Sequence, residues 1–260
     1  MSTYDTVLVE REGPIAIVRL NRPDSLNAIE AGLRRDILQA ANEVNTDASI
    51  RVVILTGEGR AFCAGADLTE KPAEGFDVEH MLNEEYKPAL MAITEAPKPW
   101  ISAVNGAAAG IGSAFAMNCD LTVMADNAYL YQAFAAISLV PDGGAHWHLV
   151  RTLGKKKAYE LIALGEKLGA DQCLQLGLCN RVVPAEQLMP EAMNLAQELA
   201  GKAPLSLRYA KQALHAATTE TLADNISTEA RLQKICMGSE DAREGAIAFL
   251  QKRAPVFKGH

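Results

Sequence analysis

Apolar residues in the first half of the chain occur in short continuous runs separated by runs at helical spacing. The continuous runs are typical of strands buried on both faces, and they cover residues 52–55, 100–104 and 121–124. Residues 6–10 and 15–20 predict two short strands, and Glu12-Gly13-Pro14 between them predicts a hairpin. Apolar side chains recur at helical spacing from Ile29 to Val44. Strands that alternate with helices predict an α/β architecture.

The pattern changes after about residue 185. Residues 186–252 show helical periodicity without a strand signal, and the helices are interrupted at residues 201–204 and 238–239. We therefore expect an α/β core over residues 1–185 and a helical region over residues 186–260. Helices that add little to a core often pack on a partner subunit, so we expect an oligomer.

An uncharged stretch between Lys98 and Asp120 is long enough to raise the possibility of a membrane helix. It contains Pro99, Asn105 and three glycines, which a spanning helix rarely combines. A buried strand, a turn at Gly106 and a buried helix explain it better. The first residues also lack the basic start and apolar run of a signal peptide, so we expect a cytoplasmic protein without a membrane segment.

Composition narrows the class of protein. The 260 residues are 49% apolar, which excludes an intrinsically disordered chain. With 25 basic and 32 acidic residues the net charge is −7, which argues against a general nucleic-acid binder. Five scattered cysteines without a C-x-x-C pair make a disulfide framework or a zinc ribbon unexpected and indicate a reducing compartment.

Two glycine-rich segments follow predicted buried strands. The segment from Asn105 to Gly112 opens a helix, so its amides could hold a pyrophosphate or an oxyanion, or its glycines could only permit close packing. A short-chain dehydrogenase is excluded, because no downstream tyrosine has a lysine four residues later. The segment from Arg60 to Leu68 could be a plain turn in which Asp67 caps the next helix. Together the two segments could supply the two N–H donors that an oxyanion requires.

Asp142 stands in a third segment, Val140-Pro141-Asp142-Gly143-Gly144, just before a predicted helix. An N-cap is the structural alternative for this aspartate. His146 and His148 lack a third ligand nearby, so we expect no metal site there. Residues 249–253 join an aromatic to two cations, which suits a solvated helix end or a phosphate contact.

In this order the segments resemble the crotonase, or enoyl-CoA hydratase/isomerase, superfamily over nearly the whole chain. The resemblance is carried by residues 18–23 with 27–28, 61–68, 103–106 with 112, 119–120, 244–245, 249 and 252–253. It implies a crotonase-like spiral of ββα units with a helical C-terminal trimerisation region, in a homotrimer or a dimer of trimers. It also implies an acyl-CoA substrate, with coenzyme A as part of that substrate and no separate cofactor.

The resemblance assigns roles by position. The amides of Ala66 and Ile111 would hold the thioester oxygen. The coenzyme A nucleotide would be flanked by Arg22, Ser25, Leu26, Ala28, Ala64, Asp67 and Leu68. Phe249 and Lys252 would reach the nucleotide, with a neighbouring subunit as one source of these two residues.

Departures from the family pattern point to the reaction. Ala114 and Phe134 stand where the resembled hydratases carry two glutamates, so a two-glutamate hydration is unsupported. Asp142 matches the catalytic aspartate of family isomerases and of a dehalogenase, and its segment resembles isomerases of phenylacetate-type degradation. We therefore expect an acyl-CoA isomerase that shifts a double bond or opens an epoxide through a thioester enolate, with Asp142 as acid and base.

Two alternatives remain open at this point. One is a divergent hydratase that handles water with a residue such as Glu84 or Glu85, and the other is a non-catalytic acyl-CoA binder. Residues 70–95 carry no motif and are expected to shape the acyl pocket.

Overall fold

Two sheets form the centre of the computed structural model, which describes residues 4–71 and 75–260. The larger sheet has the order β1-β2-β3-β5-β7-β10, with bounds Val7–Glu12, Ile15–Leu20, Val52–Gly57, Trp100–Val104, Leu121–Ala125 and Arg181–Val183. The smaller sheet has the order β4-β6-β8-β9, with bounds Ala61–Cys63, Ala107–Ala109, Tyr129–Tyr131 and Lys167–Gly169. β1 and β2 form the predicted antiparallel hairpin, whereas the other neighbours in the larger sheet are parallel.

A repeated ββα order connects the two sheets. β3, β5 and β7 lie in the larger sheet, and each is followed by a short strand of the smaller sheet and then by helical structure. Every residue of β3 and β5 is buried, as their continuous apolar runs predict. The repeat confirms the predicted α/β core of ββα units.

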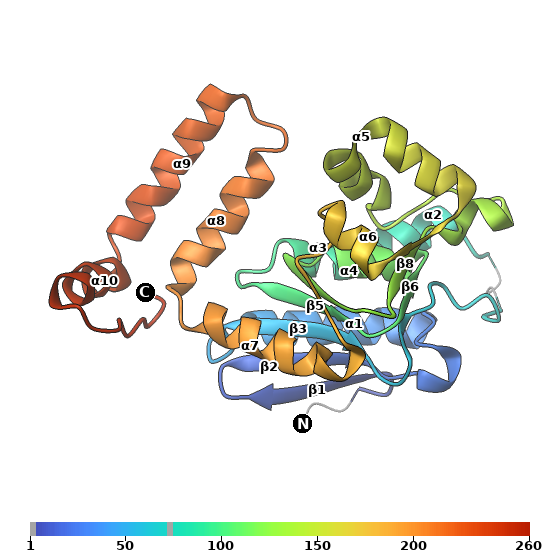
Figure 1. Ribbon diagram of the computed structural model, residues 1–260, viewed down its shortest axis with the longest axis horizontal. Coiled ribbons are helices and arrows are strands. Elements are labelled where there is room, and N and C mark those ends of the chain that lie inside the picture. The colour runs from blue at the N-terminus through green and yellow to red at the C-terminus, as the bar shows by residue number, and fades with distance from the viewer. Residues whose placement is uncertain (1–3, 72–74) are drawn as a thin grey trace.

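Helices cover these sheets (Figure 1). Those of the core are α1 Ala31–Thr46, α2 Val78–Met81, α3 Lys87–Thr94, α4 Ile111–Met117, α5 Ala145–Leu164, α6 Ala170–Gln175 and α7 Leu188–Ala200. A π-helical turn, η2 Leu82–Tyr86, joins α2 to α3, and the 3-10 turns are η1 Pro23–Ser25, η3 Ala133–Ile137 and η4 Ala185–Gln187. α7 packs against β3, β5 and β7 of the larger sheet.

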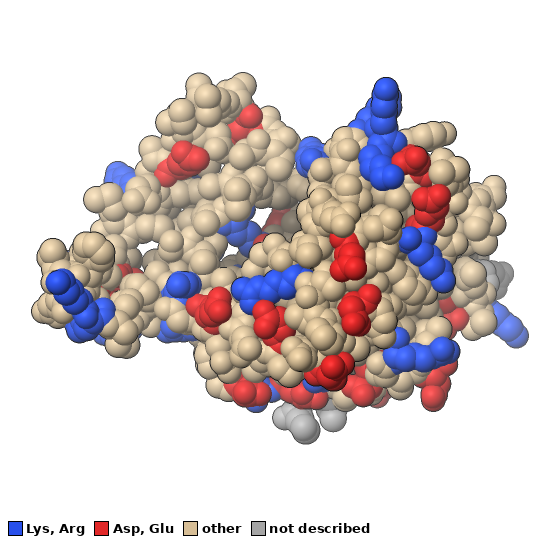
Figure 2. Space-filling view, in the orientation of Figure 1, with Lys and Arg blue, Asp and Glu red and all other residues tan. Residues whose placement is uncertain are grey.

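The last three helices project from the core as an arm, visible in orange and red in Figure 1. The arm consists of α8 Pro204–Ala216, α9 Leu222–Met237 and α10 Glu240–Gln251. Several of its large apolar side chains are exposed, among them Leu214, Leu222, Ile226, Met237, Phe249 and Leu250. Figure 2 shows a gap between the arm and the core on the face in view. The division of the chain at residue 185 stays a prediction, while α7 lies on the sheet and the chain leaves the core at α8.

The uncharged stretch near residue 100 forms β5, β6 and α4, so a buried strand, a turn and a buried helix are confirmed. Within residues 4–71 and 75–260, no helix has both the length and the apolar character needed to cross a membrane. β6, β8 and β9 were not expected from the sequence, because three residues are too few to show a period.

Asn27 fastens the turn after β2 to the start of β4. It is completely buried and has a positive φ of 56°. Its side-chain oxygen accepts a hydrogen bond from the Arg22 amide (2.9 Å). Its side-chain amide donates to the carbonyls of Glu58 (2.9 Å) and Ala61 (2.8 Å). This one side chain therefore fixes two segments that were predicted to flank the ligand.

Replacing Asn27 with Ala should lower the free energy of unfolding by about 3 kcal/mol, because buried backbone groups lose their partners and alanine tolerates the positive φ poorly. Urea unfolding measures the change. Asp24→Ala, at an exposed position of the same turn, is the control and should stay within about 0.5 kcal/mol of the wild type. Equal stability of the two variants would contradict the role given to Asn27.

Candidate active site

The two glycine-rich segments lie directly against each other. Gly65 has φ +100°, and a Cβ added there would be 3.0 Å from the Ala109 carbonyl and 3.7 Å from the Gly110 Cα. Only glycine permits both this backbone conformation and this approach. The predicted oxyanion residues, Ala66 and Ile111, each follow one of the two touching glycines.

The amides of Ala66 and Ile111 are not used by the regular structure around them. The Ile29 amide donates to the Gly65 carbonyl (2.8 Å) and the Asp67 amide donates to the Ile29 carbonyl (2.9 Å). In this parallel bridge the amide of the intervening Ala66 points away from Ile29. Ile111 is the first residue of α4, where an N–H has no acceptor within the helix. Two adjacent N–H groups are thus available for an anionic oxygen.

Asp142 is brought to the same helix by the loop of residues 142–144. A Cβ on Gly143 would be 2.6 Å from the Ala114 Cβ and 3.3 Å from the Ile111 side chain, so the loop packs tightly on α4. Gly143 and Gly144 both have positive φ, at 62° and 87°. The aspartate therefore lies close to the N-terminal turn that carries the Ile111 amide.

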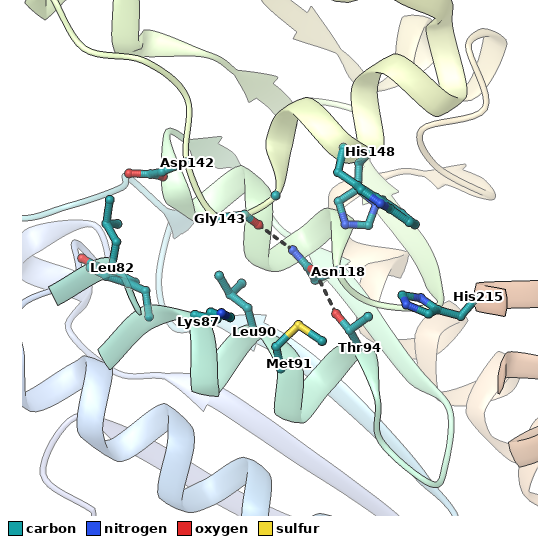
Figure 3. A pocket seen from close by; sticks show the side chains of 13 residues that line it. Leu82, Lys87, Leu90, Met91, Thr94, Asn118, Asp142, Gly143, His148 and His215 are labelled. Carbon is teal, nitrogen blue, oxygen red and sulfur yellow. Dashed lines mark hydrogen bonds between the residues drawn. The ribbon is translucent and has the colours of Figure 1, made fainter. Parts of the chain in front are cut away.

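A cavity of about 480 Å³ opens beside Asp142 (Figure 3). Its wall is mainly apolar and includes Leu82, Leu90, Met91 and Trp147. The first three come from η2 and α3, so residues between 82 and 94 do line a pocket. That this pocket takes the acyl group stays a prediction, and residues 72–74 lie outside the described part. Asp142 is the carboxylic residue among the described residues that line this cavity.

The Asp142 carboxyl group is poorly solvated. It is half-buried, and its Oδ1 is buried without a hydrogen-bond partner among the residues that the structure describes. Burial raises the pKa of Asp142 to about 6. The N-cap alternative is wrong, because Gly144 is the N-cap of α5 and no side chain caps that helix.

The two residues expected at the positions of the family glutamates, Ala114 and Phe134, are apolar and lie at this site. Ala114 is buried against Gly143, and the Phe134 ring lies beside Gly110. The alternative water-handling residues are outside the cavity wall. Glu84 is exposed, and Glu85 is paired with Arg34 at 2.6 Å.

Most residues expected to flank coenzyme A form one surface next to Ala66. The Arg22 guanidinium donates to Asp67 (3.0 Å) and to the Ala28 carbonyl, and the Ala64 amide donates to the Leu26 carbonyl (3.0 Å). Hydrogen bonds from Thr69 and the nearby Arg22 hold the pKa of Asp67 below its ordinary value. Asp67 thus stabilises its own turn and orients Arg22, whereas the expected helix cap is wrong because no helix begins at this turn within the described residues 67–71. Ser25 and Leu68 are exposed on this surface.

Phe249 and Lys252 are not brought to this surface within one chain. Phe249 lies on α10 and is 83% exposed, and Lys252 ends that helix with a positive φ of 53°. Figure 1 shows α10 at the end of the arm, far from β6, the strand that pairs with β4. Within one chain, the predicted coenzyme A contacts therefore lie in two separate places: the surface around Arg22, and the end of the arm with Phe249 and Lys252.

The cavity also contains residues that no sequence motif indicated. Tyr86 is 2% exposed, its hydroxyl is without a partner in the described part of the chain, and burial raises its pKa to about 12. Burial lowers the pKa of His148 to about 4. The Trp147 ring stacks on His215 of α8 with centroids 5.8 Å apart. No group of three metal-ligating side chains occurs within residues 4–71 and 75–260.

Comparison with known proteins agrees with this geometry. The enoyl-CoA hydratase/isomerase family model matches residues 10–260. A "Probable enoyl-CoA hydratase" of Rhodobacter capsulatus is 38% identical over 99% of both chains. The 1,2-epoxyphenylacetyl-CoA isomerase of Escherichia coli is 36% identical over 97% of this chain and 98% of its own. The crystal structure of an enoyl-CoA hydratase subunit from Geobacillus kaustophilus has a TM-score of 0.93 at 35% identity, with both chains fully covered.

The raised pKa of Asp142 predicts a gain in stability when its charge is removed. The folded state holds the proton more tightly than the unfolded state, so the stability lost to the ionised carboxyl group grows as the pH rises from about 4 to about 6 and is complete above that. Asp142→Asn should therefore raise the free energy of unfolding by about 1 kcal/mol at pH 7. The gain should shrink toward pH 4, where the folded state keeps the proton and the unfolded state begins to take it up. Urea unfolding at both pH values measures it, and a gain that is independent of pH would contradict the electrostatic cause.

Proposed function

The chain belongs to the enoyl-CoA hydratase/isomerase family, and from that premise we propose that it is an acyl-CoA isomerase with Asp142 as its acid and base. One observation carries the proposal: Asp142 is the carboxylic residue in the described cavity wall, while the positions of both family glutamates are apolar. A single carboxyl group suits the transfer of a proton between two carbons of one substrate. It does not suit a mechanism that needs two carboxyl groups.

The Ala66 and Ile111 amides would donate to the thioester oxygen. Asp142 would take a proton from the carbon next to the thioester, and the electron pair of the broken C–H bond would form the enolate with its charge on that oxygen. In a 3-enoyl thioester, the protonated Asp142 would then return the proton two carbons further along. The carbonyl re-forms and the double bond moves into conjugation, so atoms and charge balance without another reactant.

The pKa of Asp142 supports both halves of this transfer. With a value of about 6, the carboxyl group is mostly ionised at pH 7 and able to accept a proton. It is also a stronger base than an ordinary aspartate, which favours removal of a weakly acidic C–H proton. Burial in a mainly apolar cavity is the physical cause of this value.

The substrate that fits is an acyl-CoA with an apolar acyl group. The acyl group would occupy the cavity of about 480 Å³, and the nucleotide would lie on the surface around Arg22. We propose that Phe249 and Lys252 of a neighbouring subunit complete that surface in a homotrimer or a dimer of trimers. A cytoplasmic location and the opening of a ring epoxide remain parts of this proposal.

Hydration of an enoyl-CoA is the second candidate. Similar relatives that are named as hydratases favour it. The absence of a second carboxyl group from the described cavity wall argues against it. A non-catalytic acyl-CoA binder is the third candidate. Binding alone does not require a buried carboxyl group with a raised pKa, so Asp142 argues against it.

Replacing Asp142 with Asn or Ala should reduce turnover at least about 1,000-fold, because the proton acceptor is lost, while the Kd for a coenzyme A thioester changes less than about threefold. The assay uses 2-enoyl and 3-enoyl thioesters in ¹⁸O-labelled water with mass detection. A moved double bond without label supports the isomerase. Labelled hydroxyacyl product, binding without conversion, or unchanged turnover of the variants would each contradict the proposal.

Mixed oligomers test whether the arm of a neighbour completes the nucleotide surface. We expect little activity from Asp142→Ala alone and from the double variant Phe249→Ala/Lys252→Glu alone. Co-expression of the two chains should restore activity, because some sites then combine an intact Asp142 with an intact arm from another subunit. If the mixed oligomer is no more active than the sum of its parents, the contact across subunits is wrong.

A further inference from the structure

Asn118 joins three elements at the edge of the cavity (Figure 3). It directly follows α4 as its C-cap residue. Its side-chain amide donates to the Ala114 carbonyl (2.8 Å) within the helix and to the Gly143 carbonyl (3.0 Å) in the loop that carries Asp142. Its side-chain oxygen accepts a hydrogen bond from the Thr94 hydroxyl at the end of α3 (2.8 Å).

The bond to Gly143 is the one that a helix end alone does not require. Asn118 could satisfy α4 through Ala114 without reaching the loop. Gly143 and Gly144 have positive φ values and therefore a wide choice of backbone conformations. A loop of this kind adopts one position only if its neighbours hold it. The Asn118 amide is the side-chain donor to the Gly143 carbonyl within residues 4–71 and 75–260.

The Thr94 hydroxyl supports the orientation of the Asn118 side chain. The Ala114 and Gly143 carbonyls both require the amide nitrogen on their side, and the hydroxyl donates to the side-chain oxygen at the other end. Without that hydroxyl, the oxygen loses its partner and the carboxamide is held less firmly against Gly143. Thr94 therefore acts on the Asp142 loop through Asn118.

Helix α4 consequently connects both parts of the proposed chemistry. Its first residue, Ile111, presents an amide for the thioester oxygen, and Asn118 beyond its last residue holds the loop of Asp142. All seven helical residues are buried, so the helix is rigidly packed. The distance from the oxyanion donor to the carboxyl group is then set by one short helix, by the packing of Gly143 on that helix and by one hydrogen bond.

We propose that Asn118, oriented by Thr94, is a positioning residue that fixes the Asp142 carboxyl group against the oxyanion amides. The inference rests on the proposed function, since it assumes that Asp142 moves the proton. A displacement of about 1 Å in such a geometry can cost roughly 100-fold in rate. The contacts of Thr94 with Asn118 and of Asn118 with Gly143, here called the clamp, should therefore affect kcat more than substrate binding.

Three variants test the clamp. Asn118→Leu removes the donor and the acceptor at similar volume. Thr94→Val removes only the hydroxyl, and Thr94→Ser keeps it. We expect kcat to fall about 10- to 100-fold in the first two, KM to change less than about threefold, and Thr94→Ser to retain most of the wild-type rate.

The pH dependence of kcat/KM separates positioning from general loss of structure. In the wild type, kcat/KM should fall as the pH drops through about 6, where Asp142 of the free enzyme takes up a proton. A loosened loop lets water reach the carboxyl group, so this midpoint should move to lower pH in Asn118→Leu and Thr94→Val. The other ionisable groups of the described wall are Tyr86, Lys87, His148 and His215. His215→Gln should keep the wild-type midpoint, which assigns the midpoint to Asp142.

An unchanged kcat and midpoint in both Asn118→Leu and Thr94→Val would overturn the inference while the proposed function stands. An equal loss in Thr94→Ser would also overturn it. Wild-type turnover by Asp142→Asn would instead remove the proposed function, and the clamp with it.

Discussion

The close packing around α4 is the constraint on which the site depends. A Cβ added to Gly112 would lie 2.5 Å from the Cys63 carbonyl, and one on Gly143 would lie 2.6 Å from the Ala114 Cβ. Neither position has room for one more carbon. The segment from Arg60 to Leu68 and the Asp142 loop therefore both pack tightly on the same seven-residue helix. In the chain, this helix follows β6 of the smaller sheet and precedes β7 of the larger sheet. Its packing determines the geometry of the site.

The same packing explains the chemistry that the cavity favours. Burial makes the ionised Asp142 carboxyl group costly and raises its pKa to about 6, and its Oδ1 has no hydrogen-bond partner among the described residues. Ala114 and Phe134 add no second carboxyl group and keep the surroundings apolar. The ionised Asp142 therefore lowers the free energy of unfolding, and it is also the residue that would perform the proton transfer. Such a loss of stability is common at active sites. The net charge of −7 does not determine the charge at the proposed nucleotide surface, because Arg22 and Asp67 form an ion pair there.

Sequence patterns predicted the parts of this protein that are local and repeated. The buried runs located the long strands, and the glycines at 65, 110 and 112 located the two segments that meet. The clamp of Thr94, Asn118 and Gly143 escaped prediction because it forms where three elements far apart in the chain end together. Tyr86 was not predicted either, because its place in the cavity depends on elements that are far apart in the chain. Phe249 and Lys252 could be matched to the family by position, but no pattern within one chain says which subunit they serve.

The central claim is that Asp142 forms an enolate held by two backbone amides, and hydrogen exchange tests it most directly. A saturated acyl-CoA thioester incubated in deuterium oxide reports removal of the proton next to the thioester, whether or not a double bond or an epoxide is present. The wild type should introduce deuterium at that carbon, and Asp142→Asn should not, although it binds the thioester. Exchange by Asp142→Asn at the wild-type rate, or no exchange by the wild type, would contradict the account.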